Sequence, residues 1–294
     1  MRQMSPFPVR RPLVPAGLAA ALLVAALAGC APAAPTPPPA PAAPSCPAGG
    51  LPTLTPGTLT VGTDQPVYPP WYLDDDPTNG QGFESAVAYA VAENLGYAKD
   101  KVAWARVPFN AAIQPGPKTY DINLTEFSIT EERRVAVDFS SPYYDVKQAV
   151  VTIGTSPAAN AASLAELKNA KLGAQVGTTS YQAIVDQIAP SAPPAVFNTN
   201  DDAKLALTNG QVDAIVVDLP TAFFITGAEL DGGKIIGQLP LAAGTPEQFG
   251  IVLDKGSALT PCVTRAVDAL RAAGTLTALE TQWLASGGNA PELK

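Results

Sequence analysis

The chain has 294 residues, of which 47% are hydrophobic, and a formal net charge of −8 at neutral pH. This length is sufficient for one large domain or two modest ones. An acidic balance without any basic run argues against a nucleic-acid partner. The chain contains no histidine, which excludes histidine-based acid–base catalysis and histidine metal sites. We expect neither a metal nor a cofactor.

The first 29 residues have the features of a signal peptide. Three arginines form a basic region, and the uncharged apolar run at residues 16–28 is too short to span a bilayer comfortably. The alternative is a membrane helix retained as an anchor. The run ends in Leu27-Ala28-Gly29-Cys30, which resembles the bacterial lipobox and implies cleavage before Cys30 and lipid attachment to its sulfur. Removal of residues 1–29 leaves a net charge of −11.

Residues 31–50 contain eight prolines and seven alanines and little else. Such a segment cannot bury a core, and its composition favours an extended polyproline II conformation. Twenty residues at about 3.1 Å each reach roughly 60 Å. We therefore expect residues 30–54 to form a semi-rigid stalk that holds a folded domain away from the membrane.

The first part of the folded chain alternates strands with a helix. Residues 58–63, 102–107 and 120–125 have the pattern of strands, and residues 83–95 place apolar side chains at helical spacing. Strands that alternate with helices predict a mainly parallel sheet covered on both faces. The fold class is therefore α/β.

The segment from Tyr120 to Tyr144 holds the first candidate site. Thr130 is a suitable N-cap for a short helical turn, and Arg133 follows Ser128 by five residues, so that both face the space beyond the strand end. A guanidinium beside a hydroxyl and free backbone N–H groups suits a small carboxylate, because arginine offers a planar fork for two charge-assisted bonds. The alternative is an arginine paired with Glu131, Glu132 or Asp138 on a solvated face.

A second α/β series begins with a capping box at residues 163–166 and contains two further candidates. Gly177, Thr178 and Thr179 enter a helix after the strand at residues 171–175, and such a helix start can bind an anion; the alternative is an ordinary capped helix. Asp218 ends a wholly apolar strand, where an acid is unfavourable unless it meets a cation. The alternative is an N-cap for the next helix.

Three stretches together resemble one family. The patterns S-I-T-x-E-R…V-D-F-S-x-P-Y-Y, V-G-T-D…Y-P-P-W…G-Q-G-F-E and G-x-V-D-A-x-x-x-D are similar to those of the family 3 extracellular solute-binding proteins, the polar amino-acid-binding proteins of ABC importers. The resemblance covers nearly all of residues 57–285. It implies a type II periplasmic-binding-protein fold with two lobes, each a mainly parallel sheet flanked by helices, joined by a two-strand hinge. Lobe 1 would comprise residues 55–152 and 244–288, lobe 2 residues 153–243, and residues 289–294 a tail.

The resemblance also implies the role of each candidate residue. Ser128 and Arg133 would hold the α-carboxylate of a free amino acid, with Thr178 and Thr179 contributing from the second lobe. Asp218 would bind the α-ammonium. Tyr68 would stack over the ligand and Asp64 would lie towards its side chain, although this chain has one extra residue between them. The partners implied are a free amino acid and the permease subunits of an ABC transporter, with the binding protein acting as a monomer outside the cytoplasm.

Specificity for the ligand side chain depends on Asp64 and Glu126. Glu126 stands where the family commonly has a small residue, and two acids near the distal pocket would favour a cationic or polar side chain. Glu126 could equally point outward and pair with Lys118 or Arg134. The competing class is an enzyme on the same fold, because dehydratases of prephenate-like substrates resemble these binding proteins and Glu126 or Asp218 could donate a proton. A sensory ectodomain is a third class, but no downstream membrane helix follows.

Two cysteines remain once Cys30 is assigned to lipid. In an exported protein, oxidising conditions favour pairing, so we predict a disulfide between Cys46 and Cys262 that ties the end of the stalk to a late helix. The alternative is two free thiols.

Overall fold

The structure is a computed structural model that describes residues 45–284 and 290–294. The expected signal peptide, Cys30 and most of the expected stalk lie outside the described residues. Within the described ranges, no helix is both long enough and apolar enough to cross a membrane.

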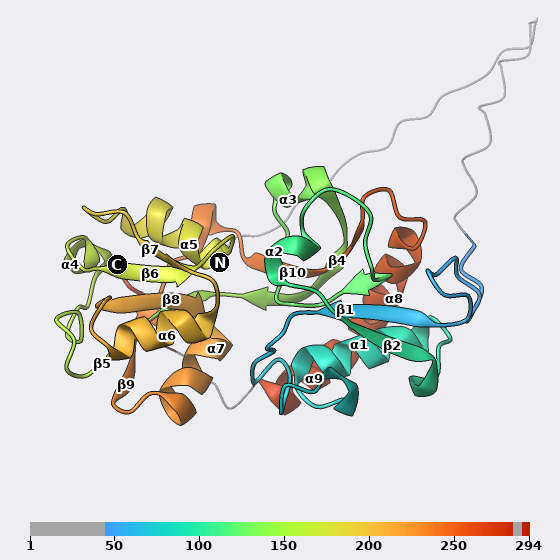
Figure 1. Ribbon diagram of the computed structural model, residues 1–294, viewed down its shortest axis with the longest axis horizontal. Coiled ribbons are helices and arrows are strands. Elements are labelled where there is room, and N and C mark those ends of the chain that lie inside the picture. The colour runs from blue at the N-terminus through green and yellow to red at the C-terminus, as the bar shows by residue number, and fades with distance from the viewer. Residues whose placement is uncertain (1–44, 285–289) are drawn as a thin grey trace, which may run out of the picture. The chain divides into compact units, whose positions relative to one another are not determined.

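The first sheet has five strands in the order β2-β1-β3-β10-β4 (Figure 1). Strand β1 pairs in parallel with β2 and β3, and β10 runs antiparallel to both β3 and β4. Four strands therefore point the same way, with β10 reversed between two of them. Their bounds are Leu59–Thr63 (β1), Val102–Arg106 (β2), Ile122–Asn123 (β3), Val137–Val146 (β4) and Glu247–Asp254 (β10).

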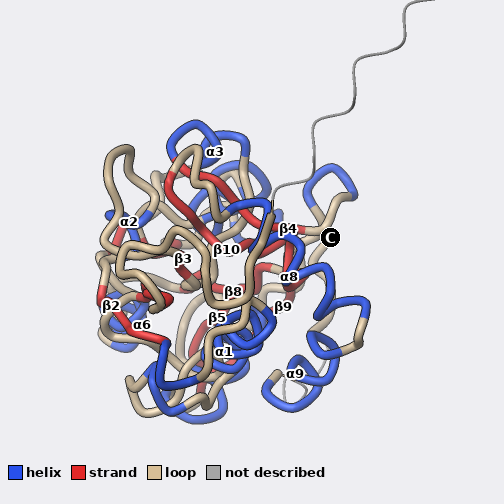
Figure 2. The backbone as a smooth tube through the Cα atoms, turned by 90° about the vertical axis from the view of Figure 1, so that its right-hand side faces the viewer, coloured by secondary structure: helices blue, strands red, loops and turns tan. Residues whose placement is uncertain are grey.

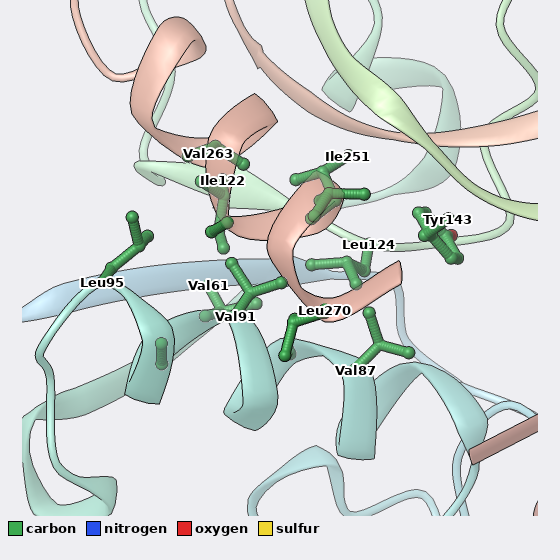
Figure 3. Packing of buried hydrophobic residues seen from close by; sticks show 14 of the residues in the cluster. Val61, Val87, Val91, Leu95, Ile122, Leu124, Tyr143, Ile251, Val263 and Leu270 are labelled. Atoms are coloured by element: carbon green, nitrogen blue, oxygen red, sulfur yellow. The ribbon is translucent and has the colours of Figure 1, made fainter. Parts of the chain in front are cut away.

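Helices α1, α8 and α9 pack together against the first sheet. Figure 3 shows Val87 and Val91 of α1 and Val263 and Leu270 of α8 around the apolar side chains of the strands. Burying several such side chains stabilises the fold by about 1.5–3 kcal/mol each. The helical segments are Pro77–Asn79 (η1), Phe83–Asn94 (α1), Lys99–Lys101 (η2), Phe109–Ala112 (α2), Glu131–Ala136 (α3), Thr260–Ala272 (α8) and Thr275–Trp283 (α9).

The second sheet also has five strands, in the order β7-β6-β8-β5-β9. Strand β6 pairs in parallel with β7 and β8, and β5 runs antiparallel to β8 and β9. Alternate side chains of a strand point to opposite faces, and here both faces are buried: Val150 packs into one apolar cluster and its neighbours Ala149 and Val151 into another. The bounds are Gln148–Ile153 (β5), Leu172–Gln175 (β6), Ala195–Phe197 (β7), Ala214–Asp218 (β8) and Gly233–Gln238 (β9).

Helices cover both faces of the second sheet. Leu207 of α6 and Ile225 after α7 belong to one cluster, while Ile184 and Ile188 after α5 belong to the other. The helical segments are Leu164–Leu167 (α4), Thr179–Ala183 (α5), the π-helical turn Ile184–Ile188 (η3), Asn200–Thr208 (α6), Leu219–Phe224 (α7), the π-helical turn Ile225–Glu229 (η4) and Ala242–Gly244 (η5). We call the first sheet with its helices lobe 1, and the second sheet with its helices lobe 2.

The chain passes between the lobes twice, each time in a connection between two β-strands. The first passage lies at Lys147, between β4 and β5, and the second lies between β9 and β10. Figure 2 shows β4 beside β10, as their antiparallel pairing requires. The sequence had placed residues 147–152 in lobe 1, whereas β5 pairs within the second sheet. The mainly parallel two-lobed α/β fold is thus confirmed by strand direction and by the two separate sheets.

Both ends of the described chain are attached to the fold. A disulfide joins Cys46 to Cys262 of α8, with Cα atoms 5.7 Å apart. At the other end, Gln238 of β9 donates its N–H to the carbonyl oxygen of Pro291, and Leu293 donates its N–H to that of Gln238. Leu293 is buried in the core of lobe 2. The terminal residues expected to be a simple tail therefore extend the edge of the second sheet.

Candidate ligand-binding site

A cavity lies where the two lobes face each other. Its wall includes most of the candidates that the sequence singled out, together with several that it did not. Lobe 1 contributes Asp64, Pro66, Val67, Tyr68, Phe109, Thr125, Glu126 and Arg133, and lobe 2 contributes Gln175, Thr178, Thr179, Ser180, Asn200, Val217 and Asp218.

Arg133 is held in place by its helix and by both lobes. Thr130 caps α3 by accepting a hydrogen bond from the Arg133 N–H at 3.1 Å. The guanidinium donates to the carbonyl oxygen of Ser128 in lobe 1 at 2.7 Å and to that of Gly177 in lobe 2 at 2.9 Å. It also stacks over the Phe109 ring, 5.6 Å from the ring centroid. These contacts fix the plane of the fork and leave further N–H groups available for a ligand.

Arg133 is buried, with 8% of its surface exposed, and burial lowers its pKa. In the described part of the chain, no carboxylate lies within 4.0 Å of its guanidinium, and the pairing with Glu131, Glu132 or Asp138 is not observed. Glu131 pairs with Arg134 instead, at 3.6 Å. A buried cation without a counter-ion is unfavourable, because its lost hydration is not replaced by a fixed partner. The site therefore favours an anion from outside the chain.

The acids Asp218 and Asp64 of the cavity lack a cationic partner among the described residues. Asp218 begins α7 but its carboxylate does not cap the helix; it accepts a hydrogen bond from Gln148 Nε2 at 2.7 Å. Burial, followed by the charge of Glu247, raises the pKa of Asp218 well above its usual range. Burial also raises the pKa of Asp64, which lines the wall from lobe 1. None of the ion pairs in the described ranges includes either acid. A cationic group would lower the pKa of both carboxyls.

Glu126 is half-buried and lines the cavity. Its backbone is left-handed, with φ of +53°, an unusual conformation for a residue with a side chain. Its N–H donates to Glu84 Oε1 at 2.7 Å, which holds the turn. Burial and the neighbouring charge of Glu84 raise the pKa of Glu126 well above its usual range. Lys118, the partner considered from the sequence, bonds to the carbonyl oxygen of Gln114 instead.

The start of α5 forms the lobe 2 side of the site. Thr178 caps the helix: its hydroxyl accepts from the Tyr181 N–H at 3.2 Å and donates to the carbonyl oxygen of Gln175 at 2.7 Å. Because its proton is already engaged, the Thr178 hydroxyl has none to offer a ligand. The first backbone N–H groups of α5 remain available for an anion, as expected for a helix start.

Tyr68 and Ser128 occupy different positions relative to the cavity. Tyr68 lines the wall, and its hydroxyl donates to Asp201 Oδ2 of α6 at 3.2 Å, which joins the two lobes at the rim. Ser128 is buried behind the wall; its hydroxyl approaches Thr179 Oγ1 at 3.2 Å and donates to Glu247. The sequence motifs predicted both residues to be at the site. Of the two, only Tyr68 is part of the cavity wall formed by the described residues.

Sequence reasoning missed three polar residues behind the wall: Glu84, Gln148 and Glu247. Glu84 lies within α1, where the helical spacing marks the apolar residues as core. No local sequence feature distinguishes Glu84 from an ordinary acidic residue in the first turn of a helix. Gln148 and Glu247 each begin a strand at a passage between the lobes. The available signal in the sequence was a polar residue at the start of a mostly apolar strand.

The geometry defines a two-lobed protein whose cavity wall holds one cation, Arg133 of lobe 1, and acids from both lobes, none of which forms an ion pair among the described residues. The profile of the bacterial extracellular solute-binding proteins, family 3, matches residues 59–286. The chain belongs to this family. The L-arginine-binding protein of Pseudomonas aeruginosa is 30% identical over 233 residues, covering 73% of this chain and 86% of that protein.

Solved structures agree with the family assignment. An ancestral arginine-binding protein bound to glutamine has a TM-score of 0.65 at 32% sequence identity, covering 78% of this chain and 98% of that one. The ancestral amino acid-binding protein AncCDT-1, a precursor of cyclohexadienyl dehydratase, has a TM-score of 0.64 at 28% identity, covering 77% of this chain and 95% of that one. The related proteins are amino-acid-binding proteins, which matches the class predicted from the sequence motifs.

Proposed function

We propose that this protein captures a free amino acid with a cationic or polar side chain by lobe closure and delivers it to the permease of an ABC importer. The observation that carries this proposal is the buried Arg133, which has no carboxylate within 4.0 Å among the described residues. Across the cavity, Asp218 is a half-buried acid that forms no ion pair among the described residues. A zwitterion supplies the missing charge to each, its carboxylate to Arg133 and its ammonium to Asp218.

Closure follows from the distribution of these groups. Arg133 and Glu126 belong to lobe 1, whereas Thr179 and Asp218 belong to lobe 2, so a ligand makes all its bonds only when the lobes meet. It therefore binds the closed state more tightly and shifts the population towards it. The two passages between β-strands are the hinge in this proposal. We assign residues 55–146 and 244–288 to lobe 1 and residues 148–243 to lobe 2, with the first passage at Lys147.

The ligand side chain would face Asp64, Tyr68 and Glu126. The two carboxyls and Asp218 outnumber the single cation Arg133 in the wall, and a zwitterion does not change this balance. A ligand with a cationic side chain offsets the excess of acidic groups. Its charge favours the ionised forms of Asp64 and Glu126, whose pKa values are raised. Tyr68 offers its ring face to the same cation. We therefore expect L-arginine to bind more tightly than acidic or aliphatic amino acids.

Export and anchoring complete the proposal. The residues that support it are the signal peptide at 1–29, the lipobox cysteine Cys30 and the stalk at 30–54, together with membership of an extracellular family. In this proposal the protein is a monomer on the outer face of the cell membrane, and it meets the membrane only through its N-terminal lipid.

A second candidate is a dehydratase acting on a prephenate-like substrate. Two observations favour it: the similarity to a precursor of cyclohexadienyl dehydratase, and the raised pKa values of Glu126 and Asp218, which suit proton donors. Binding without turnover remains our proposal, because the unpaired Arg133 and Asp218 match the two charges of an amino acid. An assay for prephenate turnover separates the two.

The proposed function is tested by thermal unfolding of residues 31–294 with each of the twenty amino acids, ornithine, citrulline and cystine. A ligand at 100 times its dissociation constant adds about 2.7 kcal/mol to the free energy of unfolding, which raises the midpoint by roughly 5–10 °C. We expect arginine to give the largest rise and glutamate none. Absence of a rise with every amino acid, after refolding to remove carried-over ligand, would contradict the proposal.

A further inference from the structure

The two strands that follow the passages between the lobes, which we call the hinge strands β5 and β10, each begin with a polar side chain that bonds to residues of the site. Gln148 is the first residue of β5 and Glu247 is the first residue of β10. Neither belongs to the cavity wall, yet both bond to residues that do. They form one connected network behind the wall, and this network determines which atoms of the wall can donate and which can accept.

Glu247 accepts hydrogen bonds from both lobes. Thr179 Oγ1 of lobe 2 donates to Glu247 Oε1 at 2.5 Å, and Ser128 Oγ of lobe 1 donates to the same oxygen. Gln148 Nε2 donates to Oε2 at 3.1 Å. The carboxylate therefore lies at a point where lobe 1, lobe 2 and both hinge strands meet.

Gln148 extends the network to the proposed ammonium partner. Its Nε2 also donates to Asp218 Oδ1 at 2.7 Å, and its Oε1 accepts from Ser180 Oγ at 2.6 Å. The side-chain amide is thereby fixed in one orientation. One oxygen of Asp218 is engaged by Gln148, and the other is left for a ligand.

The bonds to Glu247 determine which hydroxyl protons remain for a ligand. A hydroxyl has one proton to donate and two lone pairs, and an ionised carboxylate can only accept. Because Thr179 and Ser128 both donate to Glu247, neither hydroxyl has a proton for a ligand carboxylate. Thr179 and Asp218 both line the cavity from lobe 2, so this lobe presents acceptors to a ligand. Acceptors suit an ammonium, while the ligand carboxylate is left to Arg133 and the backbone N–H groups of α5.

We propose that Glu247 is a positioning residue that fixes the Thr179 and Ser128 hydroxyls as acceptors and thereby makes the site select a ligand ammonium. The residue acts through Thr179 and touches no ligand atom itself. This inference rests on the proposed function, because it requires an amino acid in the cavity. It assigns to the hinge strand a chemical role in addition to its mechanical one.

The test compares L-arginine with 5-guanidinopentanoate, which has the same carboxylate and guanidinium but no ammonium. Both are titrated calorimetrically into the unaltered protein, Glu247→Gln and the control Asp145→Asn. Asp145→Asn removes the same charge from β4, the strand that precedes the first passage, where Asp145 is exposed and bonds only to Gln248 among the contacts described. In Glu247→Gln the side-chain amide can donate to the Thr179 hydroxyl oxygen. The Thr179 hydroxyl proton is then free to point towards the ligand.

We expect Glu247→Gln to weaken L-arginine binding by about 10- to 100-fold, the effect of one charge-assisted hydrogen bond. Binding of 5-guanidinopentanoate should change less than about threefold, since it has no ammonium to lose. Asp145→Asn should change neither. Equal losses for the two ligands, or unchanged or tighter arginine binding, would overturn the proposal.

Two further results keep the test decisive. If ligand-free Glu247→Gln fails to fold, Thr179→Val replaces it, and the same selective loss of arginine binding is required. If the unaltered protein binds arginine but the variants show no selectivity for the ammonium, only this inference fails. If the unaltered protein binds no amino acid in the thermal screen, the proposed function fails and this inference falls with it.

Discussion

Trp71 Nε1 donates a hydrogen bond to Thr221 Oγ1 at 2.8 Å, and both side chains are buried. Trp71 follows the loop that carries Tyr68 in lobe 1, while Thr221 lies on α7 directly after Asp218 of lobe 2. The bond therefore joins the lobes beside the cavity. The indole is packed edge-on against Phe83, Tyr144 and Phe249, which fixes its direction. In the closed state that we propose, lobe 1 thereby supplies a rigid donor to lobe 2.

We expect Thr221→Val to weaken ligand binding about tenfold, because it keeps the shape of the side chain but removes the acceptor and leaves a buried indole N–H unpaired in the closed state. Calorimetry measures the loss. Trp71→Phe should have a similar effect on affinity, and the double variant should lose little more than either single variant. Additive losses would show that the two residues do not act through this bond.

Arg133→Ala should abolish measurable binding, because no other cation lies in the cavity wall formed by the described residues. The expected loss exceeds about a hundredfold, since the ligand carboxylate would be buried without a partner. Arg134→Ala is the matched control, because Arg134 is next in sequence but pairs at the surface with Glu131. Titration of both variants with L-arginine checks the prediction. Retained affinity in Arg133→Ala would contradict the site assignment.

The sequence predicted the α/β class and most of the first-lobe elements because their patterns are local. The helix expected at residues 83–95 is α1, and Thr130 caps α3 as expected. It did not predict β4, whose ten residues include two serines and Pro142 and show no clean alternation. Strand β4 is defined by its pairing with β10, a contact between segments about a hundred residues apart. Periodicity within a window carries no information on such a partner.

The same reason limits prediction of the site. Arg133, Thr179 and Asp218 lie in motifs whose local chemistry is visible in the sequence. The proposed role of Glu247 is not visible in any local motif, because it depends on Ser128 and Thr179, which come from different lobes. The orientation of Glu126 was left open for a similar reason: a left-handed turn and the bond to Glu84 decide it.

Removal of the disulfide should lower stability without changing the site. Cys46 and Cys262 are separated by 216 residues, and cross-linking a long loop stabilises by about 2–5 kcal/mol in the chain-entropy account. We expect the variant with both cysteines changed to serine to unfold at a lower denaturant concentration than the oxidised parent. Its affinity for L-arginine should be unchanged, because neither sulfur lies near the cavity wall. Equal midpoints for the two proteins would show that the bridge contributes nothing.

Glu126→Gln should reduce both the affinity for L-arginine and its dependence on pH. Because the pKa of Glu126 is raised by burial, by Glu84, by Asp218 and by Asp64, the carboxyl is protonated at low pH and must lose its proton to pair with a cation. Affinity of the parent for arginine should therefore rise as pH increases. Calorimetry in two buffers of different ionisation enthalpy detects the released proton. L-Glutamine is the control ligand: it has the same ammonium for Asp218 but a neutral side chain, so the part of the rise that Glu126 contributes should appear with arginine and not with glutamine.

Glu84 provides the sharpest test of pH-dependent stability. Its Oε1 accepts from the Tyr143 hydroxyl and the Glu126 N–H, while Oε2 has no partner among the described residues. Burial raises the pKa of Glu84 to about 7, against the opposing effect of these two donors. Between about pH 4.5 and 7, the folded protein holds a proton that the unfolded chain has released. The free energy of unfolding therefore decreases as pH rises through this window, by about 3 kcal/mol from this group.

Glu84→Gln removes this contribution, because the amide keeps the acceptor for both donors but has no proton to lose. We expect urea unfolding of the ligand-free variant to depend less on pH than that of the parent, and the variant to be the more stable of the two at pH 8. Glu93→Gln on the same helix is the control, since Glu93 is exposed and should leave the parent profile unchanged. Glu126 and Asp218 have raised pKa values as well, so the parent slope includes their contributions. The difference between the two profiles isolates Glu84 and its influence on Glu126, and identical slopes would show that Glu84 is ionised in the folded protein.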